Sequence, residues 1–325
     1  MNGCLPLQPG SLPSLYSFRL LERSARSEDE SNFIIVKYAI FFCLLLFCAT
    51  SQATTPFTVT DVSGTQVVFA TPPQRIISLA PNLTELAYAA GMGSHMVAVT
   101  AYSDYPQQAK QLPQVGDAFR LDWERLVALK PDLVLAWGSG LSSRDRARFE
   151  KLKLKVLVLE PRRLDDIPKV LRLLGGVAGI EAVAEAAALA FVQQLDTLRR
   201  QYAGRALVRA YFQIAAAPLL TVNDAHIISD VLRLCGAQNV FAAVPLLTPA
   251  ISNEALIKEN PQVMLAVAAT HEQEEETKRI WRGLPLIAVR QGQIAFIHPD
   301  LISRSTPRIL LGAKRICEHI ESARH

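Results

Sequence analysis

The chain has 325 residues, of which 50% are hydrophobic and 20% are charged. This composition supplies enough apolar side chains for a sizeable core and excludes a disordered chain, and the length favours two lobes over one. The formal net charge is only +4, and the basic residues are scattered among acidic ones. Nucleic acid is not an expected partner, because binding it would call for a basic stripe.

Residues 1–53 are predicted to contain a secretory signal peptide. Lys37 supplies the positive charge, residues 38–48 form an apolar run, and Ser51-Gln52-Ala53 has the pattern of a cleavage site. The apolar run has about a dozen residues, whereas a membrane anchor needs about 20. We therefore expect cleavage and export to the periplasm, with a membrane anchor as the alternative. Because the signal begins so late, we expect translation to start at Val36 and residues 1–35 to remain untranslated.

Residues 54–163 are predicted to form an α/β lobe in which apolar strands alternate with amphipathic helices. The expected strands cover 57–69, 76–79, 96–100, 133–137 and 156–159, and the expected helices cover 82–90, 122–129 and 142–153. Asn82 or Thr84 is expected to open the first of these helices. Continuous apolar strands separated by helices predict a parallel sheet that is covered on both faces.

Residues 164–204 are predicted to be a helical linker. After a break at Gly175-Gly176, residues 180–202 carry apolar side chains at helical spacing without Gly or Pro. A helix of this length extends about 35 Å, enough to reach from one lobe to another. An ordinary long helix within one domain is the alternative.

Residues 205–325 repeat the first lobe. The pattern of residues 84–91 recurs at 229–236, that of 124–136 at 254–266, and that of 155–161 at 293–299. Three matches at nearly constant offsets indicate a duplication. The predicted fold is therefore α/β, with two similar Rossmann-like lobes of mainly parallel sheet joined by one long α-helix. The cleft between such lobes is a favoured place for a small-molecule site.

The duplication places Glu124 and Glu254 at matching corners of the two lobes. A symmetric pair of carboxylates suits a two-fold partner that carries basic pockets. The alternative is that each glutamate only serves the dipole and the cap of its helix.

Two cysteines, Cys235 and Cys317, remain after removal of the signal region. An even number in an exported chain favours a disulfide over two buried free thiols. They are too far apart in sequence for a local metal motif.

Four segments carry a family resemblance: RIISLAPNLTELAYAAG, TAYSDYPQQA, DWERLVALKPDLVLAW and DLISRSTPRILL. Together they resemble the periplasmic cobalamin-binding proteins of bacterial vitamin importers. These are helix-linked, two-lobed (class III) members of the solute-binding proteins that serve ABC transporters. The resemblance covers residues 75–325 and implies a protein that captures cobalamin or a related corrinoid as a transported ligand, with no cofactor, no resident metal and no catalytic residues.

The resemblance also implies ligand-binding residues. Tyr102 would pack against the corrin, Trp137 would be a cleft tryptophan, and the pair Asp300 and Arg304 would contact the amide groups at the edge of the ligand. A large, flat, amide-fringed macrocycle needs such apolar walls and a few polar groups. The alternatives are that Tyr102 or Trp137 belongs to a lobe core and that Asp300 and Arg304 form a surface ion pair.

The sequence departs from the family at two cleft aromatics. One position holds Ala118, with Phe119 beside it, and the other holds Thr248. Weaker affinity or a corrinoid with another lower base would follow, unless Phe119, Phe212 and Leu247 compensate.

For Glu124 and Glu254 the resemblance implies docking to arginines of an ABC permease dimer that works with ATPase subunits. It also implies that Cys235 and Cys317 form the family's disulfide. The binding protein itself is expected to be a monomer.

Two other functions stay open at this level. One is the binding of ferric siderophore or haem, for which Arg120 and Arg304 could serve the ligand. The other is a hydrolase on the same α/β layers. No phosphate-loop or zinc-protease motif occurs, and the histidines lack metal-ligand spacing. An enzyme is therefore not predicted.

Overall fold

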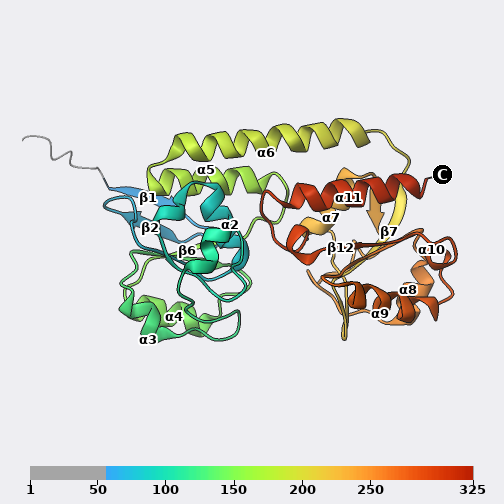
Figure 1. The fold of residues 1–325 in the computed structure, drawn as a ribbon, viewed down its shortest axis with the longest axis horizontal. Coiled ribbons are helices and arrows are strands. Elements are labelled where there is room, and N and C mark those ends of the chain that lie inside the picture. The colour runs from blue at the N-terminus through green and yellow to red at the C-terminus, as the bar shows by residue number, and fades with distance from the viewer. Residues whose placement is uncertain (1–55, 325) are drawn as a thin grey trace, which may run out of the picture. The chain divides into compact units, whose positions relative to one another are not determined.

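The computed structural model describes residues 56–324, which form two α/β lobes and a long helix that runs along both of them (Figure 1). The predicted signal peptide at 1–53 lies outside these residues. Within residues 56–324, no helix has both the length and the apolar character needed to cross a bilayer.

The N-terminal lobe is built on a four-stranded parallel sheet in the order β4-β3-β5-β6. Its strands are β3 (Ile76–Ser78), β4 (Met96–Ala98), β5 (Leu133–Trp137) and β6 (Val156–Leu159), and an antiparallel hairpin of β1 (Phe57–Thr60) and β2 (Gln66–Phe69) precedes them. The helices are α2 (Pro81–Ala89), η1 (Met92–His95), η2 (Gln107–Gln111), α3 (Trp123–Ala128), α4 (Ser143–Lys151) and α5 (Asp166–Ala178). Nearly every residue of the sheet is buried, as expected for a parallel sheet covered on both faces.

The C-terminal lobe repeats this plan with a parallel sheet in the order β10-β7-β11-β12. Its strands are β7 (Val208–Gln213), β10 (Ala237–Asn239), β11 (Val263–Val267) and β12 (Ile294–Ile297), with a small ribbon of β8 (Ala215–Ala216) and β9 (Leu219–Leu220). The helices are α7 (Ile227–Leu234), α8 (Asn253–Glu259), α9 (His271–Arg282), α10 (Ile287–Arg290), η3 (Pro299–Leu301) and α11 (Ile309–Ser322). In both lobes the first strand lies second in the sheet and the second strand lies at its edge. The predicted duplication and fold class are confirmed.

A repeated arginine shows how closely the lobes correspond. Arg75, just before β3, donates to the carbonyl oxygen of Leu129 at 3.0 and 2.7 Å, where α3 ends. Arg209, at the start of β7, donates to the carbonyl oxygen of Glu259 at 2.7 Å, where α8 ends. Each arginine thus satisfies a helix-terminal carbonyl that has no partner within its own helix.

The start of α2 differs from the prediction. The helix begins at Pro81, and Ala80 precedes it in extended conformation without a side-chain cap. Proline suits the first helical position because its missing N–H would have no partner there. Thr84, one of the two expected caps, is instead buried inside the helix, where its hydroxyl lies 3.1 Å from that of Ser103.

The expected break at Gly175-Gly176 is also wrong, because α5 runs through both glycines and ends at Gly179, which has a left-handed φ of 68°. Gly175 has a packing role. A Cβ atom there would lie 2.3 Å from the Cβ of Ala184 in α6 (Glu181–Tyr202). The glycine therefore lets α5 and α6 approach closely.

Helix α6 contacts α5 on the N-terminal side and α7 and α11 on the C-terminal side. It runs over both lobes, as Figure 1 shows. One cluster of buried hydrophobic side chains extends from Ile76 in β3 through Leu174 in α5 and Leu195 in α6 to Val231 in α7. The two lobes therefore share apolar packing through α5 and α6. The lobe boundaries at 163 and 204 remain predictions.

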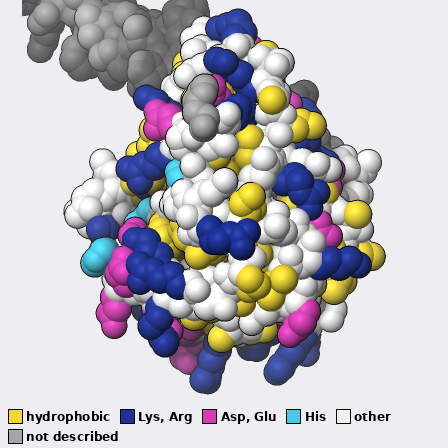
Figure 2. Space-filling model, turned by 90° about the vertical axis from the view of Figure 1, so that its right-hand side faces the viewer, with side chains coloured by type: hydrophobic (Ala, Val, Ile, Leu, Met, Phe, Trp, Pro, Cys, Tyr) yellow, Lys and Arg dark blue, Asp and Glu magenta, His cyan; other side chains and the backbone are white. Residues whose placement is uncertain are grey.

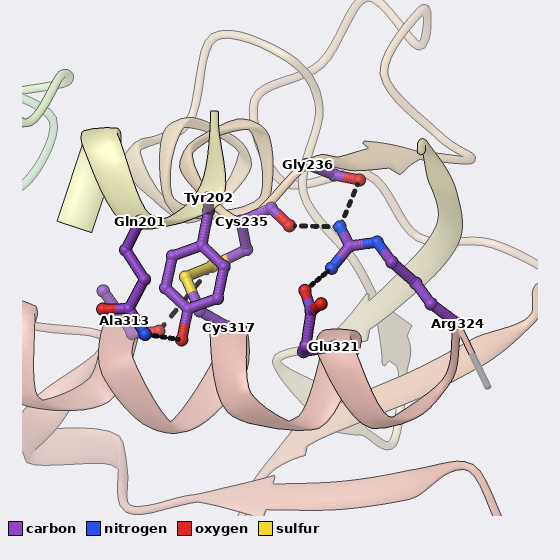
Figure 3. Close-up of a disulfide and its surroundings, with 8 residues drawn as sticks. All are labelled: Gln201, Tyr202, Cys235, Gly236, Ala313, Cys317, Glu321 and Arg324. Atoms are coloured by element: carbon purple, nitrogen blue, oxygen red, sulfur yellow. Dashed lines mark hydrogen bonds and ion pairs between the residues drawn. A yellow bond between two sulfur atoms is a disulfide. The ribbon is translucent and has the colours of Figure 1, made fainter. Parts of the chain in front are cut away.

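The disulfide between Cys235 and Cys317 is present and ties the end of α7 to α11 (Figure 3), with 4.6 Å between the two Cα atoms. Arg324 braces the same region by donating to the carbonyl oxygens of Cys235 at 2.7 Å and Gly236 at 3.2 Å, and it pairs with Glu321. Gly236 has a left-handed φ of 68°, which side chains rarely adopt, so the turn favours glycine.

Figure 2 shows the end of the molecule that the C-terminal lobe forms, where basic and acidic side chains are interspersed with small hydrophobic patches. On this face the charges do not gather into a stripe of one sign.

Candidate ligand-binding cleft

Two adjoining cavities lie between the lobes, with volumes of about 370 and 550 Å³. They share Trp137, His226 and Ser305, so they are two parts of one cleft. The N-terminal lobe contributes residues that follow β3, β5 and β6, and the C-terminal lobe contributes the start of α7 and the loop before α11. A cleft at the carboxyl ends of parallel strands is where α/β folds place their ligands.

The six predicted ligand-binding residues are distributed unevenly over this cleft. Phe119, Trp137 and Arg304 line the first cavity, and Trp137 and Thr248 line the second. The two remaining residues, Tyr102 and Asp300, line neither, but both contact Arg304. The side chain of Tyr102 is 78% exposed.

Phe119 is presented by a loop with a fixed backbone. Asp117 accepts hydrogen bonds from the backbone N–H groups of Phe119 at 2.8 Å and Arg120 at 2.9 Å, and these bonds lower the pKa of the Asp117 carboxyl. Gly116 precedes them with a φ of 120°, which other residues rarely adopt. The ring of Phe119 is 99% exposed. An aromatic side chain held over a cavity but left in water is suited to cover an apolar ligand.

Phe212 cannot compensate for a lost cleft aromatic, contrary to the expectation from sequence. It lies in β7 and is completely buried in the core. Leu247 does line the second cavity, beside Thr248.

Arg304 spans the boundary between the lobes. Its Nη1 donates to Glu85 and Asp104, both at 2.8 Å, and its Nη2 donates to the carbonyl oxygen of Tyr102 at 3.2 Å and lies 2.8 Å from Asp300. Burial disfavours the charged guanidinium, but the bonds to Glu85 and Asp104 outweigh it and raise the pKa of Arg304. The predicted pair of Asp300 and Arg304 exists, yet Arg304 is largely occupied by protein groups.

Glu85 is the centre of this inter-lobe network and was not predicted from the sequence. It lies in α2 with its side chain 2% exposed. Besides Arg304, it accepts hydrogen bonds from Arg308 at 2.9 and 2.5 Å and from Thr306 at 2.9 Å. Arg308 also stacks over the ring of Tyr105, 3.9 Å from its centroid. Two features of the sequence could have pointed to this network. Glu85 lies among apolar positions of its helix, and Arg304 and Arg308 are four residues apart.

A second polar group in the cleft was also missed. Glu160, directly after β6, has its side chain 9% exposed and lies 3.3 Å from Arg162. A Cβ atom at position 138 would lie 2.3 Å from this carboxylate, so Gly138 makes room for it. His226 begins α7 opposite them. Burial, with a contribution from Arg162, lowers the pKa of His226 to about 4.

Glu124 and Glu254 occupy equivalent places in the first turns of α3 and α8, and both side chains are exposed. The helix caps are other residues. Asp122 accepts from the N–H of Arg125 at 3.0 Å, and Ser252 accepts from that of Ala255 at 3.2 Å. The glutamates are therefore not needed as caps. A hydrogen bond from Ser252 lowers the pKa of Glu254.

Within residues 56–324, no group of three or more His, Cys, Asp and Glu side chains is arranged to hold a metal ion.

Two α/β lobes, a helix running along both and a cleft lined from each side are the features of a solute-binding protein. The chain belongs to the periplasmic binding protein family, whose sequence profile matches residues 76–301. It is therefore a binding protein of the periplasm rather than an enzyme, which confirms the predicted class and location.

A vitamin B12-binding protein of Pectobacterium carotovorum subsp. carotovorum (strain PC1) is 38% identical over 250 residues, or 76% of this chain and 88% of that protein. The crystal structure of a periplasmic vitamin B12 binding protein of Vibrio cholerae matches with a TM-score of 0.72 and 34% identity, over 78% of this chain and 98% of that one. A periplasmic heme-binding protein of Roseiflexus sp. RS-1 matches with a TM-score of 0.68 and 21% identity, over 78% and 99%. This last likeness concerns the fold alone.

Proposed function

We propose that the chain captures cobalamin, or a closely related corrinoid, in the cleft between its lobes and delivers it to an ABC importer. The observation that carries the proposal is the 38% identity to a vitamin B12-binding protein over 88% of that protein's length. The corrinoid would be the transported ligand and not a resident cofactor.

The cleft is suited to such a ligand. Phe119 and Trp137 offer aromatic surface to a flat ring, and Thr248 and Leu247 line the opposite side. Tyr102 is exposed beside Arg304 and would cover the mouth of the cleft. One carboxylate oxygen of Asp300 pairs with Arg304. The other would accept a hydrogen bond from an amide group of the ligand.

For delivery, we propose that Glu124 and Glu254 dock onto a permease dimer with its ATPase subunits, and that the binding protein acts as a monomer. Both carboxylates are exposed, occupy equivalent helices and are not required as helix caps. Two equivalent negative groups match a partner with two-fold symmetry. Export through a cleaved signal peptide within residues 1–53 belongs to the same proposal.

Calorimetric titration of the purified protein tests the ligand. Cyanocobalamin should bind at one site per chain, and cobinamide measures how much the lower base and nucleotide contribute. Haem serves as the competing candidate. Binding of haem together with no binding of either corrinoid would overturn the proposal in favour of haem transport.

A further inference from the structure

His226 lies directly before α7 in the C-terminal lobe. It lines both cavities of the cleft. It is one of three residues common to the two cavities, together with Trp137 and Ser305. A ligand that fills both cavities would therefore lie against this imidazole.

The hydrogen bonds of His226 define which ring nitrogen carries the proton. Nδ1 caps α7 by accepting a hydrogen bond from the backbone N–H of Ile228 at 3.2 Å. In a neutral imidazole the other nitrogen, Nε2, then carries the proton. Among residues 56–324, no protein group accepts a hydrogen bond from this Nε2–H.

The neutral form is the one that the surroundings favour. Burial lowers the pKa of His226 to about 4, and the nearby positive charge of Arg162 acts in the same direction. At the pH of a neutral or mildly acidic periplasm the ring thus keeps one N–H donor and no net charge.

Arg304, another hydrogen-bond donor that lines the first cavity, is already engaged. The Nη atoms of Arg304 contact Glu85, Asp104, Asp300 and a backbone carbonyl. A ligand that competes for them would have to break ion pairs, one of them with the nearly buried Glu85. Nε2 of His226 can donate at no such cost.

We propose that His226 is a specificity-determining residue of the cleft, whose Nε2–H donates a hydrogen bond to an amide carbonyl oxygen at the edge of the bound corrinoid. This inference rests on the proposed function. Glu160 and Arg162 line the same cavity and extend the polar contact, with Glu160 accepting from amide N–H groups. Because the Nε2 lone pair is replaced by a proton, His226 does not bind the cobalt.

Two substitutions separate the donor from the helix cap. Asparagine is a favoured capping residue, but it is too short to reach the ligand, so His226→Asn keeps the cap and removes the donor. His226→Gln places an amide N–H₂ near the position of Nε2. His271→Asn is the control, because His271 is an exposed histidine in the first turn of α9 and lines neither cavity.

In titrations with cyanocobalamin, His226→Asn should weaken binding by about 3- to 10-fold, the effect of one lost hydrogen bond. His226→Gln should stay within about 2-fold of the unaltered protein, as should His271→Asn. Circular dichroism confirms that each variant is folded. The absorption bands of aquacobalamin should not change on binding to the unaltered protein, since no imidazole replaces its water ligand.

The outcomes distinguish this inference from the proposed function. If the unaltered protein binds neither cyanocobalamin nor cobinamide, both are overturned. If it binds and His226→Asn binds equally well, or if His226→Gln is as weak as His226→Asn, only the donor role is overturned. A shift of the aquacobalamin bands that disappears in His226→Asn would show that the imidazole binds cobalt instead.

Discussion

Glu85 and Arg304 join the two lobes across 219 residues of sequence, with 2.8 Å between Oε1 and Nη1. The carboxylate is almost completely buried and also serves Arg308 and Thr306. Both arginines come from the segment before α11, whereas Glu85 comes from α2. The network therefore fixes how the lobes meet at one side of the cleft.

Replacing Glu85 by Ala should lower the free energy of unfolding by about 3 to 5 kcal/mol, because Arg304 and Arg308 would stay partly buried without their carboxylate. Urea denaturation measures this loss. The matched control is Glu185→Ala, which breaks a two-bond pair with Arg172 at 2.6 and 3.0 Å on the exposed surface. Solvent screens that pair, so little change is expected. Equal losses of unfolding free energy in the two variants would show that the buried network of Glu85 stabilises the protein no more than an exposed ion pair does.

Much of the fold follows from local sequence. Strands 133–137 and 156–159 match β5 and β6 because continuous apolar runs between turn signals specify buried strands. The duplication was visible because equivalent elements keep one pattern. The Gly175-Gly176 break was wrong because close packing against Ala184 outweighs the poor helix propensity of glycine.

The site was less accessible to sequence reasoning. Glu85 acquires its role only through arginines more than 200 residues away, and no local pattern reports such a pairing. His226 is a single histidine in a loop, and its place in the cleft depends on how two lobes meet. The prediction for Trp137 came from the family resemblance, and it agrees with the position of this residue at the end of β5, the edge where α/β folds bind ligands.

Phe119→Ala should weaken cyanocobalamin binding by about tenfold or more while leaving stability unchanged. The ring is 99% exposed, so its removal costs the folded protein no packing, whereas contact with a ligand would bury it. Calorimetry and thermal unfolding measure the two effects. Val68→Ala, which removes another exposed apolar side chain, is the control. A loss of stability without a loss of affinity would mean that Phe119 does not contact the ligand.

Glu124→Ala and Glu254→Ala should reduce vitamin uptake by cells, the double variant more than either single one. Affinity for cyanocobalamin should stay the same, because both carboxylates lie outside the residues that line the cleft. Glu276→Ala, on the exposed surface of α9, should not affect uptake. An affinity loss parallel to the uptake loss would argue against docking.

Removal of the disulfide by Cys235→Ala with Cys317→Ala should cost about 4 to 5 kcal/mol of stability in the loop-entropy description. The bridge closes a sequence separation of 82 residues. Thermal unfolding with and without reductant measures the effect. The unaltered protein should respond to reductant and the double variant should not; an unaltered protein that ignores reductant would contradict a stabilising bridge.

Stability should fall as the pH decreases from about 6.5 towards 4. Burial lowers the pKa of His226 to about 4 and also lowers that of His319, so the unfolded chain binds more protons than the folded one in this range. Urea denaturation at pH 7.5 and 5 measures the difference, which should shrink in His226→Asn. If the protein were more stable at pH 5 than at pH 7.5, and if this difference depended on His226, folding would raise the pKa of His226 rather than lower it.

The attachment of α6 to both lobes has a consequence for transport. The two lobes share an apolar core along this helix and are joined by an ion network at the cleft. Both features oppose a wide hinge motion of one lobe relative to the other. The distance between Glu124 and Glu254 would then be nearly the same with and without cargo. An importer that recognises this distance would accept vacant carriers as readily as filled ones, so the proportion of filled carriers in the periplasm would govern the import rate.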